Sequence, residues 1–337
     1  MFEPGLIGAL ETQNRFIRSA TAEFSADNED GTVTSEYFDL YSELARGGIG
    51  LIIQGHLYIL DEGKSHDNMA GISHDFHLQG LKKLVDLVHN FNGLIAAQIN
   101  HGGAHSTSKK GPSQREGTET RVMTEEDIEM VITGFEMAAQ RAKKAGYDAV
   151  QIHSAHGYLL SQFLSSRINQ RHDGWGGTLE KRAQLLFSVV EGVKRKVGAD
   201  YPVLVKMNGS DEPFDGFSIE ESTWVAKGLV EEGIDAVEIS GMKSTRTFKL
   251  KNEGYFAETA KRIKKEIWDT PLISVGGHRT YSKIQQLRKH VDFVSLSRPF
   301  IREPHLVHKF RKGKEQADCI SCSKCMKVEG IIRCVNL

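Results

Sequence analysis

Cysteine is absent from most of this chain. The four that occur, Cys319, Cys322, Cys325 and Cys334, all lie in the C-terminal tail. That distribution argues against a disulfide framework that holds a core together. No run of residues approaches the roughly 18 consecutive apolar residues that a membrane-spanning helix needs. The N-terminal residues MFEPGLIGALETQNR also lack the basic and apolar regions of a signal peptide. We therefore expect a cytoplasmic protein with no membrane partner.

An excess of charge of either sign is also missing. Lys and Arg number 43 against 44 Asp and Glu, which gives a formal net charge of −1. Such a balance provides no electrostatic reason to expect a nucleic-acid partner. The 337 residues are enough for one large α/β barrel or for two average domains.

Short β-branched runs alternate with longer helical patterns along the chain. The candidate strands are Arg15–Ala20, Gly50–Gln54, Leu94–Gln98, Ala149–His153, Val203–Met207, Ala236–Ser240, Leu272–Val275 and Phe293–Leu296. The candidate helices are Ser35–Arg46, His74–Asn90, Glu125–Ala145, Leu179–Val197, Ile219–Glu232, Tyr255–Ile267 and Ser282–Lys289.

This alternation predicts the α/β class, as a (β/α)8 TIM barrel over residues 1–315 followed by a short Cys-rich tail over residues 316–337. An open doubly wound sheet would need a GxGxxG turn after the first strand, and the residues ATAEF at 20–24 do not resemble one.

Two histidines and a tyrosine lie where the fourth candidate strand ends and its loop begins, at the end of a parallel barrel where chemistry is done. His153 and His156 could donate hydrogen bonds to a carbonyl oxygen or oxyanion, bind a metal, or simply be hydrogen-bonded at the barrel rim. Tyr158 on the same loop is a candidate proton donor and favours the first interpretation. A hydrolytic barrel with a metal on the histidines ranks last, because no third ligand with sensible spacing lies nearby.

The last two candidate strands end in residues that suit a phosphate. Gly276 and Gly277 follow the seventh strand, and Ser297 and Arg298 follow the eighth, where many barrels bind phosphate with backbone N–H groups. The alternative is that the glycines form only a tight turn and that Arg298 is an ordinary surface residue. Lys206 and Gln98 end two other buried strands, and together these residues predict a pocket for a planar, anionic cofactor.

The tail reads CISCSKCMKVEGIIRC, that is C-x2-C-x2-C-x8-C. Thiolates at these gaps suit an iron–sulfur cluster or zinc, and free thiols are the remaining possibility. The loop Gly102–Arg121 is long enough that we expect it to overhang the catalytic face. The loop Lys243–Lys251, with Arg246 and Lys249, is either a solvated surface or a contact for a phosphate-bearing substrate.

The stretch from His153 to Arg182, HSAHGYLLSQFLSSRINQRHDGWGGTLEKR, resembles a long motif of the old yellow enzyme family of FMN-dependent ene-reductases. Matches at Asn14–Ile17, Gly50–Ile53, Gln98–Gly103 and Ser297–Pro299 extend the resemblance over the body of the chain. The tail is similar to the cluster region of the 2,4-dienoyl-CoA reductase branch, although its cysteine spacing is tighter.

The resemblance implies FMN across the barrel mouth, with its ring against Ser19, Ala20, Thr21 and Ala22 and near Gly55 and His56. It implies that Gln98 bonds the pyrimidine edge and that Lys206 lies near N1 and O2 of the flavin. The phosphate would rest on Gly276, Gly277, Ser297 and Arg298.

The implied reaction is hydride transfer from NAD(P)H through FMN to a C=C bond conjugated to a carbonyl. His153 and His156 would hold the substrate oxygen, Phe24 would contact the substrate, and Tyr158 would protonate the α-carbon. The alternative is a flavin and iron–sulfur reductase, with a [4Fe-4S] cluster on the four cysteines and an external electron donor as partner. A homo-oligomer is compatible with either function.

Several positions depart from the family pattern. Lys206 replaces an arginine, which keeps the charge and loses the planar fork. Ala22 replaces a Thr or Cys, so any tuning of the flavin must come from elsewhere, with Thr21 as the neighbouring candidate. The remaining departures are Phe24 for a tyrosine, His56 for a small residue, Ser297 for a glycine and Trp175 for a tyrosine.

Overall fold

The protein is represented by a computed structural model that describes residues 1–114, 117–242, 252–325 and 332–335. Within those residues, no helix is both long enough and apolar enough to cross a membrane. The predicted boundary between residues 315 and 316 falls shortly after α10 (Leu306–Arg311), the last helix among the described residues, and stays a prediction.

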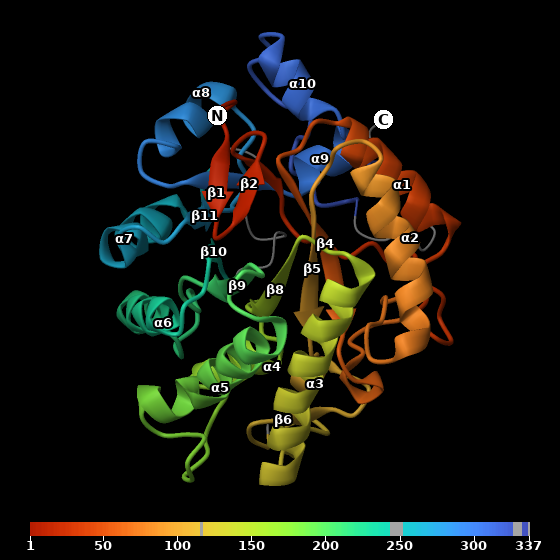
Figure 1. Ribbon diagram of the computed structural model, residues 1–337. Helices are drawn as coiled ribbons and strands as arrows, with labels where there is room; N and C mark the ends of the chain where they lie inside the picture. Colours follow the sequence, from red (N-terminus) through yellow and green to blue (C-terminus); the bar gives the residue numbers. More distant parts are fainter. Residues whose placement is uncertain (115–116, 243–251, 326–331, 336–337) are drawn as a thin grey trace.

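Eight parallel strands close into a barrel in the order β10-β11-β12-β3-β4-β5-β8-β9, which confirms the predicted (β/α)8 fold. Their bounds are β3 Phe16–Arg18, β4 Leu51–Tyr58, β5 Ile95–Asn100, β8 Ala149–Ser154, β9 Val203–Asn208, β10 Ala236–Ser240, β11 Leu272–Ser274 and β12 Phe293–Leu296. Figure 1 shows the helices on the outside of these strands.

The long helices that cover the barrel are α1 (Ser35–Arg46), α2 (Leu78–His89), α3 (Glu125–Ala145), α5 (Leu179–Val197), α6 (Ile219–Glu231), α7 (Ala257–Ile267) and α8 (Tyr281–Leu287). Local signals set their ends. For example, Thr124 and Asp127 form a capping box at the start of α3, and Gly146 ends it with a left-handed φ of 91°.

The barrel interior is apolar towards the amino-terminal ends of the strands. Every barrel strand contributes at least one residue to a buried cluster that includes Ile17, Ala96, Leu204 and Phe293. An N-terminal hairpin of β1 (Gly5–Ile7) and β2 (Leu10–Thr12) packs Ile7 into the same cluster. The hairpin therefore closes the amino-terminal end of the barrel, and the opposite end is left for the site.

The structure adds elements that the sequence pattern did not predict. These are the hairpin β1–β2, the short ladder of β6 (Lys110–Gly111) with β7 (Arg121–Val122), and the short helices α4 (Leu159–Leu164), α9 (Arg298–Arg302) and α10. Each is too short for a hydrophobic period to stand out. In addition, β4 extends beyond the predicted Gln54 to Tyr58, past an irregular register between Gln54 and Leu57.

Candidate active site

A cavity of about 380 Å³ opens at the carboxyl ends of the barrel strands. Its volume is within the range of pockets that hold cofactors and small ligands. Most of the predicted flavin and substrate residues line it, namely Ser19, Ala20, Thr21, Ala22, His56, Gln98, His153, His156, Tyr158, Lys206, Gly276, Gly277, Ser297 and Arg298. The structure thus brings together residues from seven different strand ends. Their contacts with a ligand stay predictions.

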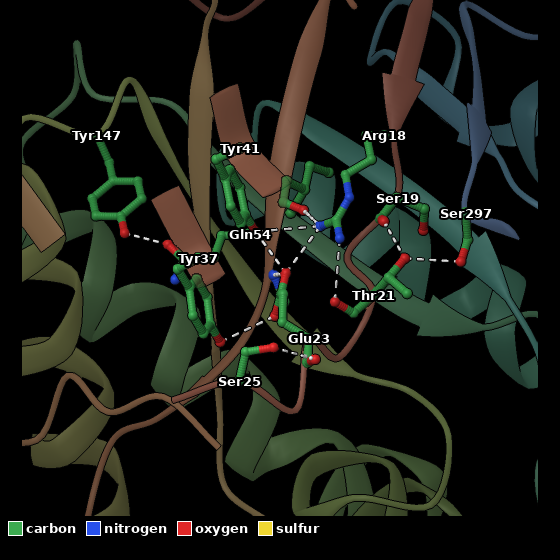
Figure 2. Close-up of polar contacts among 12 residues, drawn as sticks. Arg18, Ser19, Thr21, Glu23, Ser25, Tyr37, Tyr41, Gln54, Tyr147 and Ser297 are labelled. Carbon is green, nitrogen blue, oxygen red and sulfur yellow. Dashed lines mark hydrogen bonds and ion pairs between the residues drawn. The ribbon is translucent and has the colours of Figure 1, made fainter. Parts of the chain in front are cut away.

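The loop after β3 is held by hydrogen bonds of the Thr21 hydroxyl. Thr21 Oγ1 donates to the carbonyl of Ser19 at 2.9 Å and lies 2.8 Å from Ser297 Oγ. Figure 2 shows this pair of contacts beside the barrel strands. Ser297, which replaces a glycine of the family pattern, therefore ties the end of β12 to the loop that would face the flavin ring.

A buried ion pair lies beside the same loop (Figure 2). Arg18 Nη1 is 3.2 Å from Glu23 Oε1, and Glu23 also accepts hydrogen bonds from Tyr41 at 2.6 Å, Tyr37 at 3.3 Å and the Gly55 amide at 2.9 Å. The carboxylate is 2% exposed, so its charge is balanced almost entirely by these partners. No sequence pattern pointed to this network.

The network also explains Gly55. A Cβ at Gly55 would collide with the Glu23 carboxylate, so only glycine lets the two segments approach. Gly55 does not line the cavity; it lies against Glu23 instead. Gly55 therefore presents no surface to the cavity, and its direct contact with a flavin stays a prediction.

The loop after β11 forms a glycine cradle. Gly276 and Gly277 have φ values of 142° and 75°, and a Cβ at Gly277 would collide with the Tyr255 ring. Arg298 lies opposite and is held by Tyr255 Oη at 3.1 Å, by Ser323 Oγ at 2.9 Å and by the carbonyl of Ser321. Close backbone approach beside a fixed guanidinium suits a phosphate group.

His153, His156 and Tyr158 face the cavity as a group. The ring centroids of His153 and His156 are 5.0 Å apart, and those of His153 and Tyr158 are 5.1 Å apart. His153 Nδ1 accepts the amide of Ala155 at 3.2 Å, so the neutral ring carries its proton on Nε2. His156 has a left-handed φ of 61°, held by a bond from its amide to Asn208 Oδ1 at 3.0 Å.

Burial controls the ionisation of these side chains. It lowers the pKa of His153 well below its usual range and lowers the pKa of His156 to about 3. Burial raises the pKa of Tyr158, an effect that a hydrogen bond with Ser65 partly opposes. At neutral pH the histidines are therefore neutral donors, and the phenol keeps its proton. His156 also contacts Ser240 Oγ at 2.7 Å through Nε2, which fixes its ring.

The two remaining substrate-side residues differ in position. His56 lines the cavity, with its ring centroid 5.3 Å from that of Tyr158. Phe24 does not line the cavity; it has a left-handed φ of 55°, and its ring packs at a tilt against His66 with the ring centroids 4.5 Å apart. Phe24 is thus not among the residues that line the cavity, and its contact with a substrate stays a prediction.

A second buried carboxylate lies one layer below the cavity. Glu238 on β10 is fully buried, and its Oε1 is 3.4 Å from Lys206 Nζ. Lys206 Nζ donates to Ser19 Oγ at 2.7 Å, and Ser19 donates to Glu238 Oε1 at 2.7 Å. No sequence pattern singled out Glu238, because a glutamate in a candidate strand carries no mark of its direction.

The C-terminal tail returns to the cavity. Ser321 and Ile332 line it, and the amide of Ile332 donates to the carbonyl of Glu23 at 3.2 Å. The four cysteines line an adjoining hollow of about 20 Å³ that shares Arg298 and Ser321 with the main cavity. Among the described residues, however, no three His, Cys, Asp or Glu side chains are arranged to hold a metal ion.

The sequence also pointed to two long loops, and the structure describes most of the first and none of the second. None of the described residues in Gly102–Arg121 lines the cavity; this loop packs on α4 instead, where Gln162 Oε1 accepts the amide of Ala104 at 3.0 Å. The basic positions Lys243, Arg246, Lys249 and Lys251 lie outside the described residues.

Fold and site together define a (β/α)8-barrel protein whose cavity at the carboxyl ends of the strands is lined by the cations Lys206 and Arg298 and by His153, His156 and Tyr158. The sequence model of the NADH:flavin oxidoreductase / NADH oxidase family matches residues 1–317. The chain therefore belongs to that family of oxidoreductases.

Similar proteins agree with this membership. An NADH oxidase of Thermoanaerobacter brockii is 32% identical over 96% of this chain, and the chain spans about half of that protein, 52%. An NADPH dehydrogenase of Geobacillus thermodenitrificans is 32% identical, with 90% of this chain and 92% of the relative covered. The solved structure of an old yellow enzyme homologue from Zymomonas mobilis superimposes with a TM-score of 0.83 at 26% identity, covering 98% of both chains. The resemblance to the old yellow enzyme family is thus confirmed.

Proposed function

We propose that the protein binds FMN and transfers hydride from NAD(P)H to a C=C bond conjugated to a carbonyl group. The observation that carries this proposal is a shared cavity. Neutral His153 and His156 and protonated Tyr158 face the same space as Lys206 and the Gly276–Gly277 cradle. A small unsaturated carbonyl compound would then be the substrate.

The residues present fit FMN. The glycine cradle leaves no room for a side chain, and Arg298 beside it supplies a cation for a phosphate. Lys206 and Gln98, from β9 and β5, supply polar groups on the other side of the mouth for the pyrimidine edge of the ring. When bound, FMN would supply the hydride chemistry that no side chain of the cavity can perform.

The side chains then have separate roles. His153, with its proton on Nε2, donates a hydrogen bond to the substrate oxygen, and His156 assists from the adjacent wall. These bonds strengthen as negative charge develops on that oxygen, so they stabilise the transition state more than the ground state. Tyr158 delivers a proton to the α-carbon, which its raised pKa makes available at neutral pH.

The test replaces the two donors together. His153→Ala with His156→Ala is expected to retain FMN, because neither ring belongs to the phosphate cradle, and to lose at least about 100-fold in kcat/KM for an enone such as 2-cyclohexenone. Bound FMN is measured by absorbance and turnover by NADPH or NADH consumption. Unchanged turnover in the double variant would disprove the role of the histidine pair.

A second candidate is a flavin and iron–sulfur reductase that receives electrons from a partner protein. Its basis is the common hollow of Cys319, Cys322, Cys325 and Cys334 beside Arg298, where the described side chains would have to rearrange to hold a metal ion. Thiolates at these spacings suit a [4Fe-4S] cluster or zinc. Anaerobically purified protein with a broad absorbance shoulder and bound iron supports the cluster, whereas flavin bands alone without iron contradict it.

A further inference from the structure

The inner part of the barrel mouth contains a charge pair that no sequence motif marks. Lys206 and Glu238 are directly opposite each other in the ladder between β9 and β10. Lys206 is 2% exposed and Glu238 is fully buried. Only Lys206 lines the cavity, so Glu238 can influence a ligand there only through its charge and through its neighbours.

The contacts of Glu238 are saturated. Its Oε1 accepts hydrogen bonds from Ser19 Oγ and Ser295 Oγ, both at 2.7 Å, and its Oε2 accepts from Gln151 Nε2 at 2.9 Å. Burial alone would raise the pKa of Glu238, but the Lys206 ammonium and these hydrogen bonds outweigh it and hold the pKa below its usual value. The carboxylate is therefore ionised at neutral pH.

The same contacts fix the lysine. Lys206 Nζ donates to Ser19 Oγ at 2.7 Å, and that hydroxyl donates its own proton to Glu238. A lysine has a flexible stem with several rotatable bonds, unlike the planar fork of an arginine. In this protein, the hydrogen bonds from Lys206 to Ser19 and from Ser19 to Glu238 hold the flexible lysine side chain in place.

The charge balance of the cavity has a consequence for a redox cofactor. Lys206 and Arg298 are the only Lys or Arg among the described residues that line the cavity, and no acidic side chain is among them. A cation beside a flavin stabilises the negative charge gained on reduction and thereby raises the reduction potential. A carboxylate 3.4 Å from that cation offsets much of this effect, because the surroundings are buried and charges are weakly screened.

We propose that Glu238 is a positioning residue that holds the Lys206 ammonium at the flavin site and lowers the reduction potential of the bound flavin. A lower potential favours hydride donation by the reduced cofactor. This inference rests on the proposed function, since it requires FMN in the cavity.

The main test is the potential of the FMN-loaded protein, measured by anaerobic equilibration with a reference dye. Glu238→Gln removes the charge and keeps the size of the side chain; the amides of Gln151 and Gln98 can reverse to match it. The equilibrium constant for flavin reduction is expected to rise at least tenfold, about 30 mV for a two-electron couple. Lys206→Gln is expected to shift it at least tenfold in the opposite direction.

The double variant Lys206→Gln with Glu238→Gln removes both charges and leaves the net charge unchanged. A neutral pair commonly replaces a buried ion pair without loss of folding, so this variant tests the inference even if Glu238→Gln does not fold. Its equilibrium constant for flavin reduction is expected to lie within threefold of the wild-type value. A double variant that matches Lys206→Gln alone would overturn the inference.

Glu303→Gln is the matched control. Glu303 is a second buried carboxylate paired with lysines, Lys309 at 2.8 Å and Lys314 at 2.7 Å, but neither lysine lines the cavity. This variant is expected to leave the equilibrium constant for flavin reduction within threefold of the wild-type value. Unchanged potential in Glu238→Gln with FMN still bound overturns only this inference, whereas wild-type protein that binds no FMN overturns the proposed function as well.

Discussion

At the scale of single residues, the mouth of this barrel depends on buried charges that are fully paired. Glu23 directly follows the loop Ser19–Ala22, and Glu238 accepts a hydrogen bond from Ser19 in it; each carboxylate is bonded to a buried cation and to hydroxyl groups. Because a buried charge without a partner is costly, each pair constrains the backbone that carries it. The loop that would face the flavin ring is positioned by these two carboxylates.

Removing the Glu23 carboxylate should expose this dependence. Glu23→Ala leaves Arg18 buried with no counter-charge and frees the Gly55 amide, so the free energy of unfolding is expected to fall by about 3–5 kcal/mol. Urea denaturation followed by circular dichroism measures the change. The control is Glu43→Ala, which removes a half-exposed partner of Arg46 and is expected to cost less than about 1 kcal/mol. Equal losses in the two variants would contradict the prediction.

At the scale of elements, the site is assembled from the short segments that follow each strand. The segments after β3, β8, β10, β11 and β12 all contribute residues to the cavity lining, and each contains a residue with special backbone or hydrogen-bonding needs. Gly276 and Gly277 illustrate this need, because a Cβ on Gly277 would meet the Tyr255 ring. The precision of the cradle thus comes from backbone conformation and not from a long side chain.

Gly277→Ala should therefore disrupt FMN binding. The new methyl group displaces Tyr255, which also holds Arg298, so we expect the Kd for FMN to rise at least about tenfold. Gly233→Ala is the matched control, since Gly233 has a similar φ of 77° with open space around it. The control is expected to lose about 1 kcal/mol of stability and to keep its FMN affinity. Fluorescence titration of the apoprotein with FMN distinguishes the two variants; equal affinities would count against the cradle.

At the scale of the whole molecule, the barrel interior separates into an apolar end and a polar end. The hairpin β1–β2 closes the apolar end around Ile7. The polar layer of Gln98, Gln151, Lys206 and Glu238 forms the floor of the cavity, where Gln98 and Lys206 line it. The first layer supplies hydrophobic stabilisation, and the second supplies the electrostatics of the site. Several histidines are also buried near this polar end as neutral rings.

Those neutral rings predict a dependence of stability on pH. Burial lowers the pKa of His101 and of His278 to about 4, below the value of about 6.5 in the unfolded chain. Between these values the unfolded state binds more protons than the folded state. Stability is therefore greatest above pH 6.5 and falls as the pH decreases towards 4, by about 1.4 kcal/mol per pH unit for each histidine.

Urea denaturation at pH 7 and pH 5 measures this slope. His101→Gln removes one titrating group, so the difference in unfolding free energy between the two pH values should shrink relative to wild type. Comparing slopes and not absolute stabilities separates the titration from any general destabilisation by the substitution. A slope in His101→Gln that equals the wild-type slope would show that His101 does not titrate as proposed.

The sequence by itself determined the barrel and most of the residues at its mouth. Strands and helices are encoded by local periods and caps, so β10, β12, α1, α3 and α5 have the predicted bounds. The histidine and tyrosine loop was visible because its residues are close together in the chain. The resemblance places Gly55 and Phe24 near the cavity; neither is among the residues that line it, and they pack against Glu23 and His66.

Only the tertiary structure decided which charges meet. Glu238 is 219 residues from Ser19 in the chain, and no local period indicates that their side chains share a hydrogen bond. The closure of the barrel brings β10 beside β9 and the end of β3 near both, and it buries the carboxylate where it must find a partner. Local sequence therefore specified the elements and the reactive groups, whereas burial and long-range pairing set their charges and positions.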